Sequence, residues 1–392
     1  MLTQITNGRI LTPQGWVKDS SVLISDGHIL EVTNSELAVI GAEVVDAKGM
    51  DIVPGFVAMN LHGGGGYDFL DCTKEAFDGA VKAHLQHGAT SIFPTIIAPD
   101  LALIEQAAAV CDEVMKDPNS PVLGLHIEGP YLNPKMAKSL FIEQTNAADP
   151  AAYRALLERV HCIRRWDASP EMPGALDFAR HLAAQGILAS LSHTEVEYED
   201  VKTAYSAGFT HAAHFYNAMP GFHKRREYKY EGTVESVFFL IDPMTVEVIA
   251  DGRHLPATIL RLVYKLKGVE RTCLVTDCMP CAGCAHPQLN DPRLIIEDGV
   301  CKLADRSSLV GSIAMMDDLV RTMVQKADIP LADAVRMASE TPARLMGVID
   351  RAGTLEKGKD ADILILDHDQ RIRAVWSMGH LVPETNHLEQ GI

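Results

Sequence analysis

Side chains of the kinds that bind metals or move protons follow five short apolar runs of this chain. They are His62, Glu128, His193, His214 and Asp277. A glutamate and two histidines with an open fourth position form the ligand set of a catalytic zinc site. Such a metal lowers the pKa of a bound water and polarises a carbonyl or phosphoryl group, and an aspartate beside it can transfer the proton. These residue types favour a metal-dependent hydrolase.

The spacing of the apolar runs predicts the elements that must position these side chains. Eight runs are predicted strands: 52–57, 91–93, 122–127, 162–163, 187–191, 210–213, 246–249 and 272–276. Ala- and Leu-rich segments such as 101–115 lie between most of them and are predicted helices. This alternation indicates an α/β fold, a (β/α)₈ TIM-like barrel, with a doubly wound sheet as the alternative. In a barrel the carboxyl ends of the strands share one face, which would bring the five side chains together.

Both ends of the chain differ from its middle in their predicted secondary structure. Turns at 6–9 and 25–28 separate short β-branched runs near the N-terminus, and the turn-rich segment 353–360 precedes an apolar run near the C-terminus. We therefore expect a small β-sandwich built from residues 1–52 and 349–392, flanking a barrel of residues 53–348.

Two further motifs have competing interpretations. The run Gly63 to Gly66 is neither a P-loop nor a dinucleotide fingerprint. It is either a turn where backbone packs on backbone or a loop that leaves room for substrate. The series Cys278, Cys281 and Cys284 has the spacing of a zinc or iron–sulfur site, but it lacks an obvious fourth ligand. Small thiols lining a crowded loop are the favoured interpretation.

Charge and composition exclude several functional classes. The 392 residues include 35 basic and 52 acidic ones, for a net charge of −17, and such a surface repels nucleic acid and anionic lipid. No apolar run approaches the roughly 18 residues of a membrane span, and residues 1–8 do not read as an export signal. Eight cysteines do not form a disulfide framework at this length. We expect a cytoplasmic protein with no nucleic-acid or membrane partner.

One basic run stands out against this acidic background. His223, Lys224, Arg225 and Arg226 follow the His214 strand end closely, with Lys229 nearby. A charge run is most often a solvated face. Here its place on the expected active-site side favours phosphate recognition, because a guanidinium presents a planar fork to phosphate oxygens.

With these residues in place, the chain resembles the N-acetylglucosamine-6-phosphate deacetylases of the amidohydrolase superfamily over nearly its whole length. The motifs that carry the resemblance are Pro54-Gly55-Phe56, Gly63 to Gly66, His126 to Pro134 with its His-x-Glu-Gly-Pro start, Trp166 to Glu171, His214 to Met219, Ala250 to His254, Leu274 to Asp277, Gly311-Ser312, Thr341 to Arg344 and Gly358 to Asp362.

The resemblance implies a homodimer that removes acetyl from an N-acetyl-amino-sugar 6-phosphate. It implies one divalent metal per chain, most simply zinc, on Glu128, His193 and His214, with His62 as a further candidate ligand and Asp277 as general base and then acid. The sugar phosphate would be held by Asn217, Ala218, His254 and an arginine of the Arg225 and Arg226 pair, reaching across the dimer. The segment Leu309, Val310 and Gly311 would line the acetyl side.

Two departures from the family pattern bear on function. Where relatives often carry a His-x-His pair preceded by Asp, this chain has Ala58, Asn60 and His62, so we do not expect a second metal. Where a loop histidine normally faces the substrate carbonyl, it has Leu140, and leucine cannot donate a hydrogen bond. Either a neighbour replaces that donor or the substrate differs.

Two other functions remain open on the sequence. One is a paralogous amidohydrolase that acts on another N-acyl substrate, which the Leu140 segment favours. The other is a catalytically weak sugar-phosphate-binding protein, against which the joint retention of Glu128, His193, His214 and Asp277 argues.

Overall fold

A parallel sheet forms the centre of the molecule in the computed structural model, which describes residues 2–35, 38–137, 147–239, 243–289 and 291–385. Its seven strands run in the order β12(Thr95–Ile97), β13(Leu125–Glu128), β14(Ile163–Ala168), β15(Leu188–Leu191), β16(Phe209–Ala212), β19(Thr245–Ile249) and β20(Thr272–Val275). The strands β8(Phe56–Ala58) and β11(Ala89–Ile92) form a separate parallel pair.

Backbone hydrogen bonds connect this pair to both edges of the sheet. The Thr95 N–H donates to the Leu61 carbonyl at 3.0 Å on one side. On the other, the N–H groups of Asp277 and His62 donate to the carbonyls of Asn60 and Cys278, each at 3.0 Å. The parallel sheet with these links fits the predicted TIM-like barrel.

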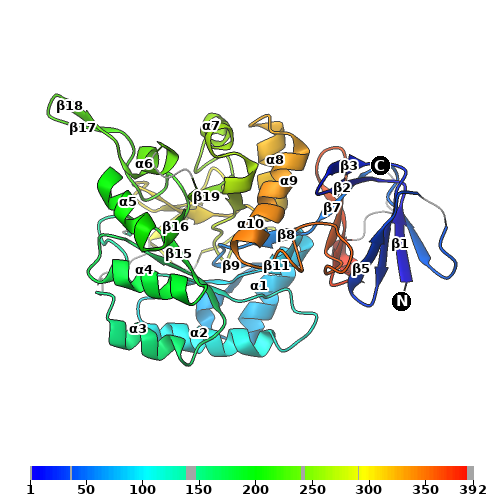
Figure 1. Cartoon of the computed structure of the whole chain (residues 1–392), viewed down its shortest axis with the longest axis horizontal. Coiled ribbons are helices and arrows are strands. Elements are labelled where there is room, and N and C mark those ends of the chain that lie inside the picture. Colours follow the sequence, from blue (N-terminus) through cyan, green and yellow to red (C-terminus); the bar gives the residue numbers. More distant parts are fainter. Residues whose placement is uncertain (1, 36–37, 138–146, 240–242, 290, 386–392) are drawn as a thin grey trace.

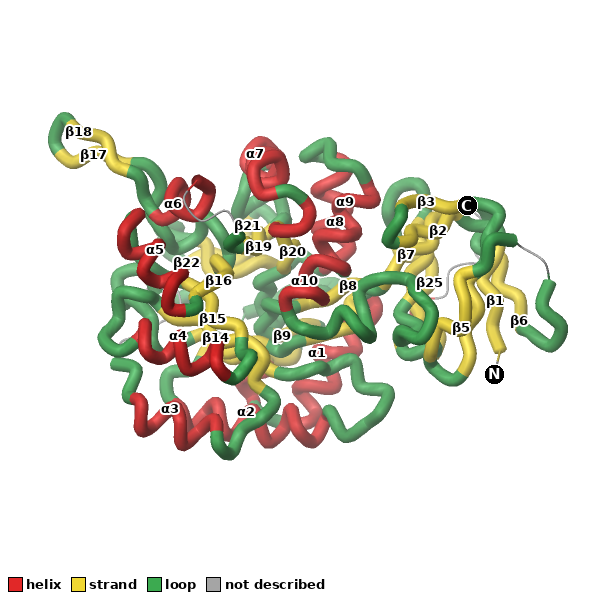
Figure 2. The backbone as a smooth tube through the Cα atoms, viewed as in Figure 1, coloured by secondary structure: helices red, strands yellow, loops and turns green. Residues whose placement is uncertain are grey.

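Helices cover the outside of the strands, as Figures 1 and 2 show. They are α1(Lys74–Gln86), α2(Leu101–Val114), α3(Pro150–Leu157), α4(Ala175–Ala184), α5(Tyr198–Ala207), α6(Thr233–Phe239), α7(Ala257–Lys267), α8(Met316–Gln325), α9(Leu331–Ala338) and α10(Glu340–Leu345), with 3₁₀ turns η1(Phe69–Asp71), η3(Val269–Arg271) and η4(Pro383–Thr385). In α2, the predicted helix, Ile104, Ala108 and Cys111 are buried at helical spacing, and Asp100 caps its first turn by accepting from the Leu103 N–H at 3.0 Å.

The predicted barrel strand 52–57 is longer than the strand that the barrel contains. The run 52–57 divides at Gly55 into β7(Asp51–Pro54), which joins a terminal sheet, and β8, which joins the barrel strands. A Cβ on Gly55 would lie 2.0 Å from Thr90 Oγ1. A glycine here lets the backbone pack closely as the chain passes from one sheet to the next.

The two ends of the chain pair with each other. One sheet has the order β5(His28–Val32), β4(Val22–Ser25), β1(Leu2–Thr6), β6(Glu43–Asp46). The other has the order β26(His380–Leu381), β25(Ile372–Ser377), β24(Ile363–Leu366), β7, β2(Arg9–Thr12), β3(Gly15–Val17). Alternation along β24 gives the six-stranded sheet two apolar faces: Ile363 and Ile365 belong to a cluster with Ile5 and Trp376, whereas Leu364 joins the main core under the barrel helices.

Smaller sheets are formed by segments between the barrel strands and helices. They are the pair β9(Gly63–Gly64) and β10(Tyr67–Asp68), the hairpin β17(His223–Arg225) and β18(Tyr228–Tyr230), and the three-stranded sheet β21(Leu294–Glu297), β22(Val300–Leu303) and β23(Leu309–Ser312). The β17–β18 hairpin stands out from the body of the molecule (Figure 1). Among the described residues no helix has the length and apolar character that a membrane crossing requires.

A buried carboxyl in the C-terminal segment gives a pH-dependent prediction for stability. Burial raises the pKa of Asp362 to about 7, against a hydrogen bond that its side chain accepts from the Met378 N–H at 2.9 Å. Since the folded pKa lies above the unfolded one, this group takes stability away as the pH rises from about 4 to 7. We expect Asp362→Asn to stabilise the protein by on the order of 2 kcal/mol at pH 8 and little at pH 4, as measured by thermal unfolding.

A carboxylate elsewhere in the C-terminal segment supplies the control. Asp367 accepts from Arg373 Nε at 2.9 Å, so Asp367→Asn removes an ion pair and should not stabilise at either pH. A gain from Asp362→Asn that is equal at pH 4 and pH 8 would show that titration of Asp362 is not its cause.

Candidate functional site

Three predicted ligands meet at the carboxyl ends of three strands of the parallel sheet. Glu128 is the last residue of β13, His193 follows β15 and His214 follows β16. All three are buried, and their ligand atoms lie within 4.8 Å of one another. His193 Nε2 is 2.7 Å from Glu128 Oε1, and His214 Nε2 is 3.5 Å from the same oxygen. The convergence expected from the sequence is therefore present.

Backbone carbonyls hold both imidazoles in one orientation. His193 Nδ1 lies 3.1 Å from the Met136 carbonyl, and His214 Nδ1 lies 3.1 Å from the Asn217 carbonyl. A carbonyl only accepts, so each Nδ1 carries a ring proton, and each Nε2 faces Glu128. That Nε2 donates to the carboxylate when the ring is protonated and offers a lone pair to a cation when the ring is neutral. Two lone pairs and a carboxylate facing one point suit a cation between them, and carbonyl-oriented imidazoles are typical of metal ligands.

The charge state of Glu128 also fits a cation. Burial disfavours its ionisation, but hydrogen bonds from His193 and His214 and the charge of His193 and His62 hold its pKa well below the usual range. In turn, Glu128 raises the pKa of His214 to about 9 against the effect of burial. Glu128 Oε2 is buried without a hydrogen-bond partner among the described residues. Glu128, His193 and His214 are therefore side chains of the types that bind a divalent metal, and Glu128 Oε2 is an oxygen that could contact it.

Asp277 lies beside this cluster, directly after β20. His62 Nε2 is 3.0 Å from Asp277 Oδ1 and 3.7 Å from Glu128 Oε2. Burial lowers the pKa of His62, but the hydrogen bond and charge of Asp277 raise it overall. The Glu128, His193 and His214 ligand atoms group without His62, so His62 is placed to orient Asp277.

Backbone strain concentrates at these strand ends. His193, His214 and Asp277 have φ values of 45°, 29° and 46°, in the left-handed region that side chains other than glycine rarely adopt. Strain of this kind persists only where surrounding contacts enforce it, and it is common at functional sites.

The contacts that enforce the His193 geometry come from a motif that the sequence analysis used only for resemblance. Ser169 Oγ donates to the carbonyls of Ser192 and His193 at 2.9 and 2.8 Å, and it accepts from the Asn133 N–H at 2.7 Å. Glu171 then accepts from Thr194 Oγ1 at 2.6 Å. This part of the Trp166 to Glu171 motif fastens the loop that carries His193.

A buried ionic network enforces the His214 geometry. Glu247 Oε1 accepts from the His214 N–H at 3.0 Å, from Asn60 Nδ2 at 2.9 Å and from Arg165 Nη2 at 2.9 Å. Arg165 also donates to both carboxylate oxygens of Asp167, at 2.8 and 2.9 Å. Arg165, Asp167 and Glu247 are fully buried. Asn60, which departs from the expected family pattern, therefore bonds to this network.

A cavity of about 510 Å³ opens over the cluster and brings most predicted site residues together. Its lining includes His62, Glu128, His193, His214, Asn217, Ala218, His254, Asp277, Leu309 and Val310. His254 Nδ1 is 2.7 Å from Asp251 Oδ2. Because a carboxylate favours the proton on Nδ1, the His254 Nε2 is left as an acceptor for a hydroxyl.

Other lining residues were not foreseen. They are Lys135, Met136, Ile249, Leu303, Ser307 and Ser308. Leu303 and the two serines belong to the β22–β23 hairpin, for which the sequence analysis made no strand prediction. Met136 contributes a backbone carbonyl to His193, which side-chain patterns do not reveal.

Four predicted site residues do not join this cavity. Arg225 and Arg226 lie on the projecting β17–β18 hairpin (Figure 2), where Arg225 pairs with Glu197 and its guanidinium lies 4.9 Å from the Tyr230 ring centre. Gly311 packs beneath the site, since a Cβ there would lie 3.1 Å from the Asp277 carbonyl oxygen. Leu140 lies outside the described residues.

The glycine run and the cysteine series have structural roles. A Cβ on Gly63 would lie 2.1 Å from the Tyr67 carbonyl oxygen, which supports the close-turn interpretation. Cys278 Sγ lies 3.3 Å from the Gly63 carbonyl, and burial raises the pKa of Cys278 to about 12. Within the part of the chain that is described, the Glu128, His193 and His214 group has metal-ligand geometry and the cysteine series does not.

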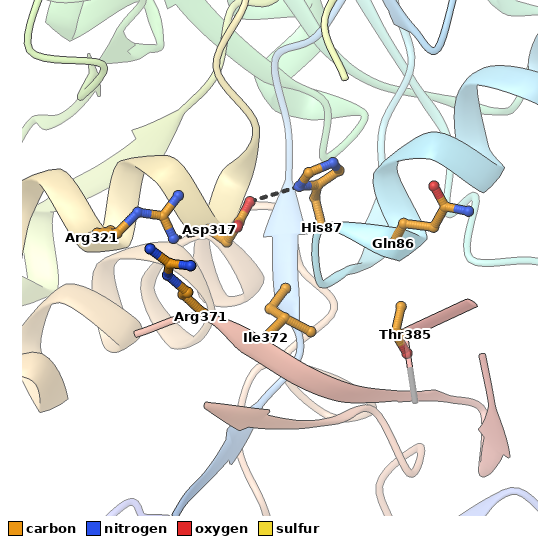
Figure 3. A pocket seen from close by; sticks show the side chains of 7 residues that line it. All are labelled: Gln86, His87, Asp317, Arg321, Arg371, Ile372 and Thr385. Atoms are coloured by element: carbon orange, nitrogen blue, oxygen red, sulfur yellow. Dashed lines mark hydrogen bonds and ion pairs between the residues drawn. The ribbon is translucent and has the colours of Figure 1, made fainter. Parts of the chain in front are cut away.

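A separate hollow of about 380 Å³ lies between α1, α8 and β25, away from this cluster. Figure 3 shows His87 paired with Asp317 in it, with Arg321 and Arg371 nearby. It holds none of the predicted site residues.

Comparisons with known proteins identify the family. The amidohydrolase family profile matches residues 52–382. The chain is 31% identical over 376 residues to N-acetylglucosamine-6-phosphate deacetylase of Haemophilus influenzae, covering 94% of this chain and 96% of that one. It is 30% identical over 390 residues to N-acetylgalactosamine-6-phosphate deacetylase of Escherichia coli O157:H7, covering 95% and 97%.

Solved structures are similar over the same extent. The N-acetylglucosamine-6-phosphate deacetylase of Pasteurella multocida superposes with a TM-score of 0.90 at 26% identity, covering 97% of this chain and 99% of that one. A mutant of the Mycobacterium smegmatis deacetylase, in complex with N-acetyl-D-glucosamine-6-phosphate, gives 0.88 at 27% identity with the same coverage.

Proposed function

The chain belongs to the amidohydrolase family, and from that premise we propose that it converts N-acetylglucosamine 6-phosphate to glucosamine 6-phosphate and acetate. The observation that carries the proposal is the meeting of Glu128, His193, His214 and Asp277 at one cavity. The full-length relatives with deacetylase names support the same chemistry, a hydrolysis of a carbon–nitrogen bond.

Glu128, His193 and His214 would hold one divalent metal, and zinc suits two imidazoles and a carboxylate with an open position. When bound, such a metal polarises the acyl carbonyl and makes water more acidic. Asn60 bonds to Glu247 and does not face this cluster as a fourth ligand, which supports one metal per chain.

Asp277 would move the proton. Its carboxylate would take a proton from the attacking water and deliver it to the leaving amine of the sugar. His62, at 3.0 Å from Asp277 Oδ1, would hold that carboxylate in place during both steps. The sugar would lie against Asn217, Ala218 and His254, on the cavity wall beyond His214.

The projecting hairpin supports a homodimer. Arg225 and Arg226 lie on the projecting β17–β18 hairpin (Figure 1) and do not line the cavity of their own subunit, and we propose that one of them binds the phosphate at the site of a second copy. We also propose that the two terminal sheets are a β-sandwich domain of residues 1–52 and 349–392 beside the barrel of residues 53–348, in a cytoplasmic enzyme.

Phosphate recognition gives a prediction on substrate selectivity. Replacing the phosphate-binding arginine, by Arg225→Ala or Arg226→Ala, should reduce kcat/KM for the 6-phosphate roughly 10–150-fold, the loss of one charge-assisted hydrogen bond. The unphosphorylated sugar should change little. Lys229→Ala removes a hairpin cation outside the arginine pair and serves as the control. Equal losses for both substrates from both arginine variants would make the hairpin structural.

The function itself is tested by product analysis. Metal-loaded protein incubated with N-acetylglucosamine 6-phosphate should release acetate and a free amine in equal amounts. Release of inorganic phosphate instead, or tight binding of the sugar phosphate without turnover, would support a different hydrolase or the sugar-phosphate-binding alternative.

A further inference from the structure

A second cavity adjoins the catalytic one. It has a volume of about 590 Å³ and shares two lining residues, His62 and Val310, with the cavity over the metal-ligand cluster. The remaining lining comes from Gly66, from Asp68 in β10, from η1, from the end of β12 and from the described segments 279–289 and 291–294. The two cavities therefore meet at His62 and Val310.

The connectivity of an amide decides which part of a substrate faces which cavity. The carbonyl carbon must lie beside Asp277 and the ligand cluster, because the bond to be hydrolysed starts there. The sugar nitrogen then leads to the wall of Asn217 and His254. The acyl chain leaves the carbonyl carbon in the other direction, towards Val310 and the second cavity.

The size and lining of the second cavity fit a group larger than acetyl. A methyl group is comparable to one water molecule, whose share of liquid volume is about 30 Å³, so acetyl would leave most of this space unused. Leu70, Ile97, Met279, Leu289 and Leu294 supply apolar surface, against which an alkyl chain gains free energy by leaving water.

The charges of the lining select against anionic acyl groups. Asp68, Asp71 and Asp291 line the cavity, and no lysine or arginine is among its described lining residues. Asp291 is balanced by an ion pair with Arg293 at 2.6 Å. Asp68 interacts with the imidazole of His62, but neither Asp68 nor Asp71 has a lysine or arginine among the described lining residues. A carboxylate at the end of an acyl chain would meet like charge.

We propose that the second cavity is an acyl-binding annex, and that the enzyme hydrolyses N-acyl-hexosamine 6-phosphates whose acyl group is a neutral chain longer than acetyl. This proposal rests on the proposed function, since it names the wider substrate class of the same site.

The first test compares acyl chains on the wild-type, metal-loaded enzyme. N-acetyl-, N-butanoyl-, N-hexanoyl- and N-succinyl-glucosamine 6-phosphate are assayed for free amine. N-butanoyl should match or exceed N-acetyl in kcat/KM, with each buried methylene adding up to about fourfold. N-succinyl, of similar length but anionic, should be at least about tenfold poorer than N-butanoyl.

The second test fills the annex. Leu70→Trp and Ile97→Trp place bulk in it from two different elements, so the failure of one variant to fold leaves the other. Each should lower the ratio of N-hexanoyl to N-acetyl turnover at least about tenfold. Leu262→Trp makes the same change on exposed α7 (Leu262 is 41% exposed) and should leave the ratio unchanged.

The outcomes separate the two proposals. Turnover of N-acetyl with rejection of N-butanoyl overturns the annex and leaves the deacetylase function standing. An unchanged chain-length ratio in both tryptophan variants also overturns the annex. Absence of turnover on the whole series overturns the proposed function, and the annex with it.

Discussion

Asp277→Asn is expected to lower kcat for N-acetylglucosamine 6-phosphate about 10²–10⁴-fold while the protein keeps its fold and its metal. Asparagine has nearly the same shape as aspartate, but its amide cannot take a proton from the attacking water or return one to the leaving amine. Asp277 contributes no ligand to the Glu128, His193 and His214 group, so metal content should stay near one per chain.

A steady-state assay alongside metal analysis checks this prediction. Asp177→Asn, at a side chain that is 71% exposed on α4, makes the same chemical change away from the site and should leave both quantities at the wild-type level. An Asp277→Asn enzyme that retains more than about a tenth of wild-type kcat would remove Asp277 from proton transfer.

The second large effect is expected from the ligand histidines. His193→Ala or His214→Ala should abolish measurable metal retention after dialysis, and turnover should fall with it. Each removes one of three protein ligands and one of the two imidazoles that offset the desolvation of the buried Glu128 carboxylate. Zinc titration followed by elemental analysis measures the loss directly, without relying on activity.

His161→Ala is the matched control, because His161 is exposed on the loop before β14. Its metal content should equal that of the wild type. If both ligand variants still retain one metal per chain with wild-type affinity, the metal lies elsewhere and the proposed ligand set is wrong.

The sequence predicts the cluster because parallel strands have a simple geometry. The carboxyl ends of the strands of a barrel share one face, so Glu128, His193 and His214 could be placed on the same face from strand order alone. The contacts that fix their orientation follow no such pattern. The Met136 carbonyl that holds His193 is a backbone group, and Ser169 acts from a loop two elements away.

A signal for the buried network was present in the sequence. Arg165 and Glu247 each stand within a predicted or neighbouring apolar strand run, and both are fully buried in the structure. Charged residues inside such runs are rarely buried without partners. They could have been predicted to pair across the barrel, but which strands face each other required the three-dimensional fold.

Register was the other limit on prediction. The sequence predicts short strands at both chain ends. However, the pairing of β24 with β7 depends on contacts between residues that are more than 300 positions apart in the sequence, such as Ile363 and Pro54. The division of 52–57 at Gly55 has the same origin. One apolar run serves two sheets, and hydrophobic pattern alone does not show where it changes from one to the other.

The central claim is metal-dependent release of acetate, and one measurement addresses it most directly. Acetate and free amine are quantified from N-acetylglucosamine 6-phosphate with the protein as purified, after chelator treatment and after zinc is restored. We predict equal release of both products, its loss on chelation and its recovery at about one zinc per chain. Full deacetylation by protein that holds no metal, or no deacetylation by protein that holds one zinc, would contradict the account.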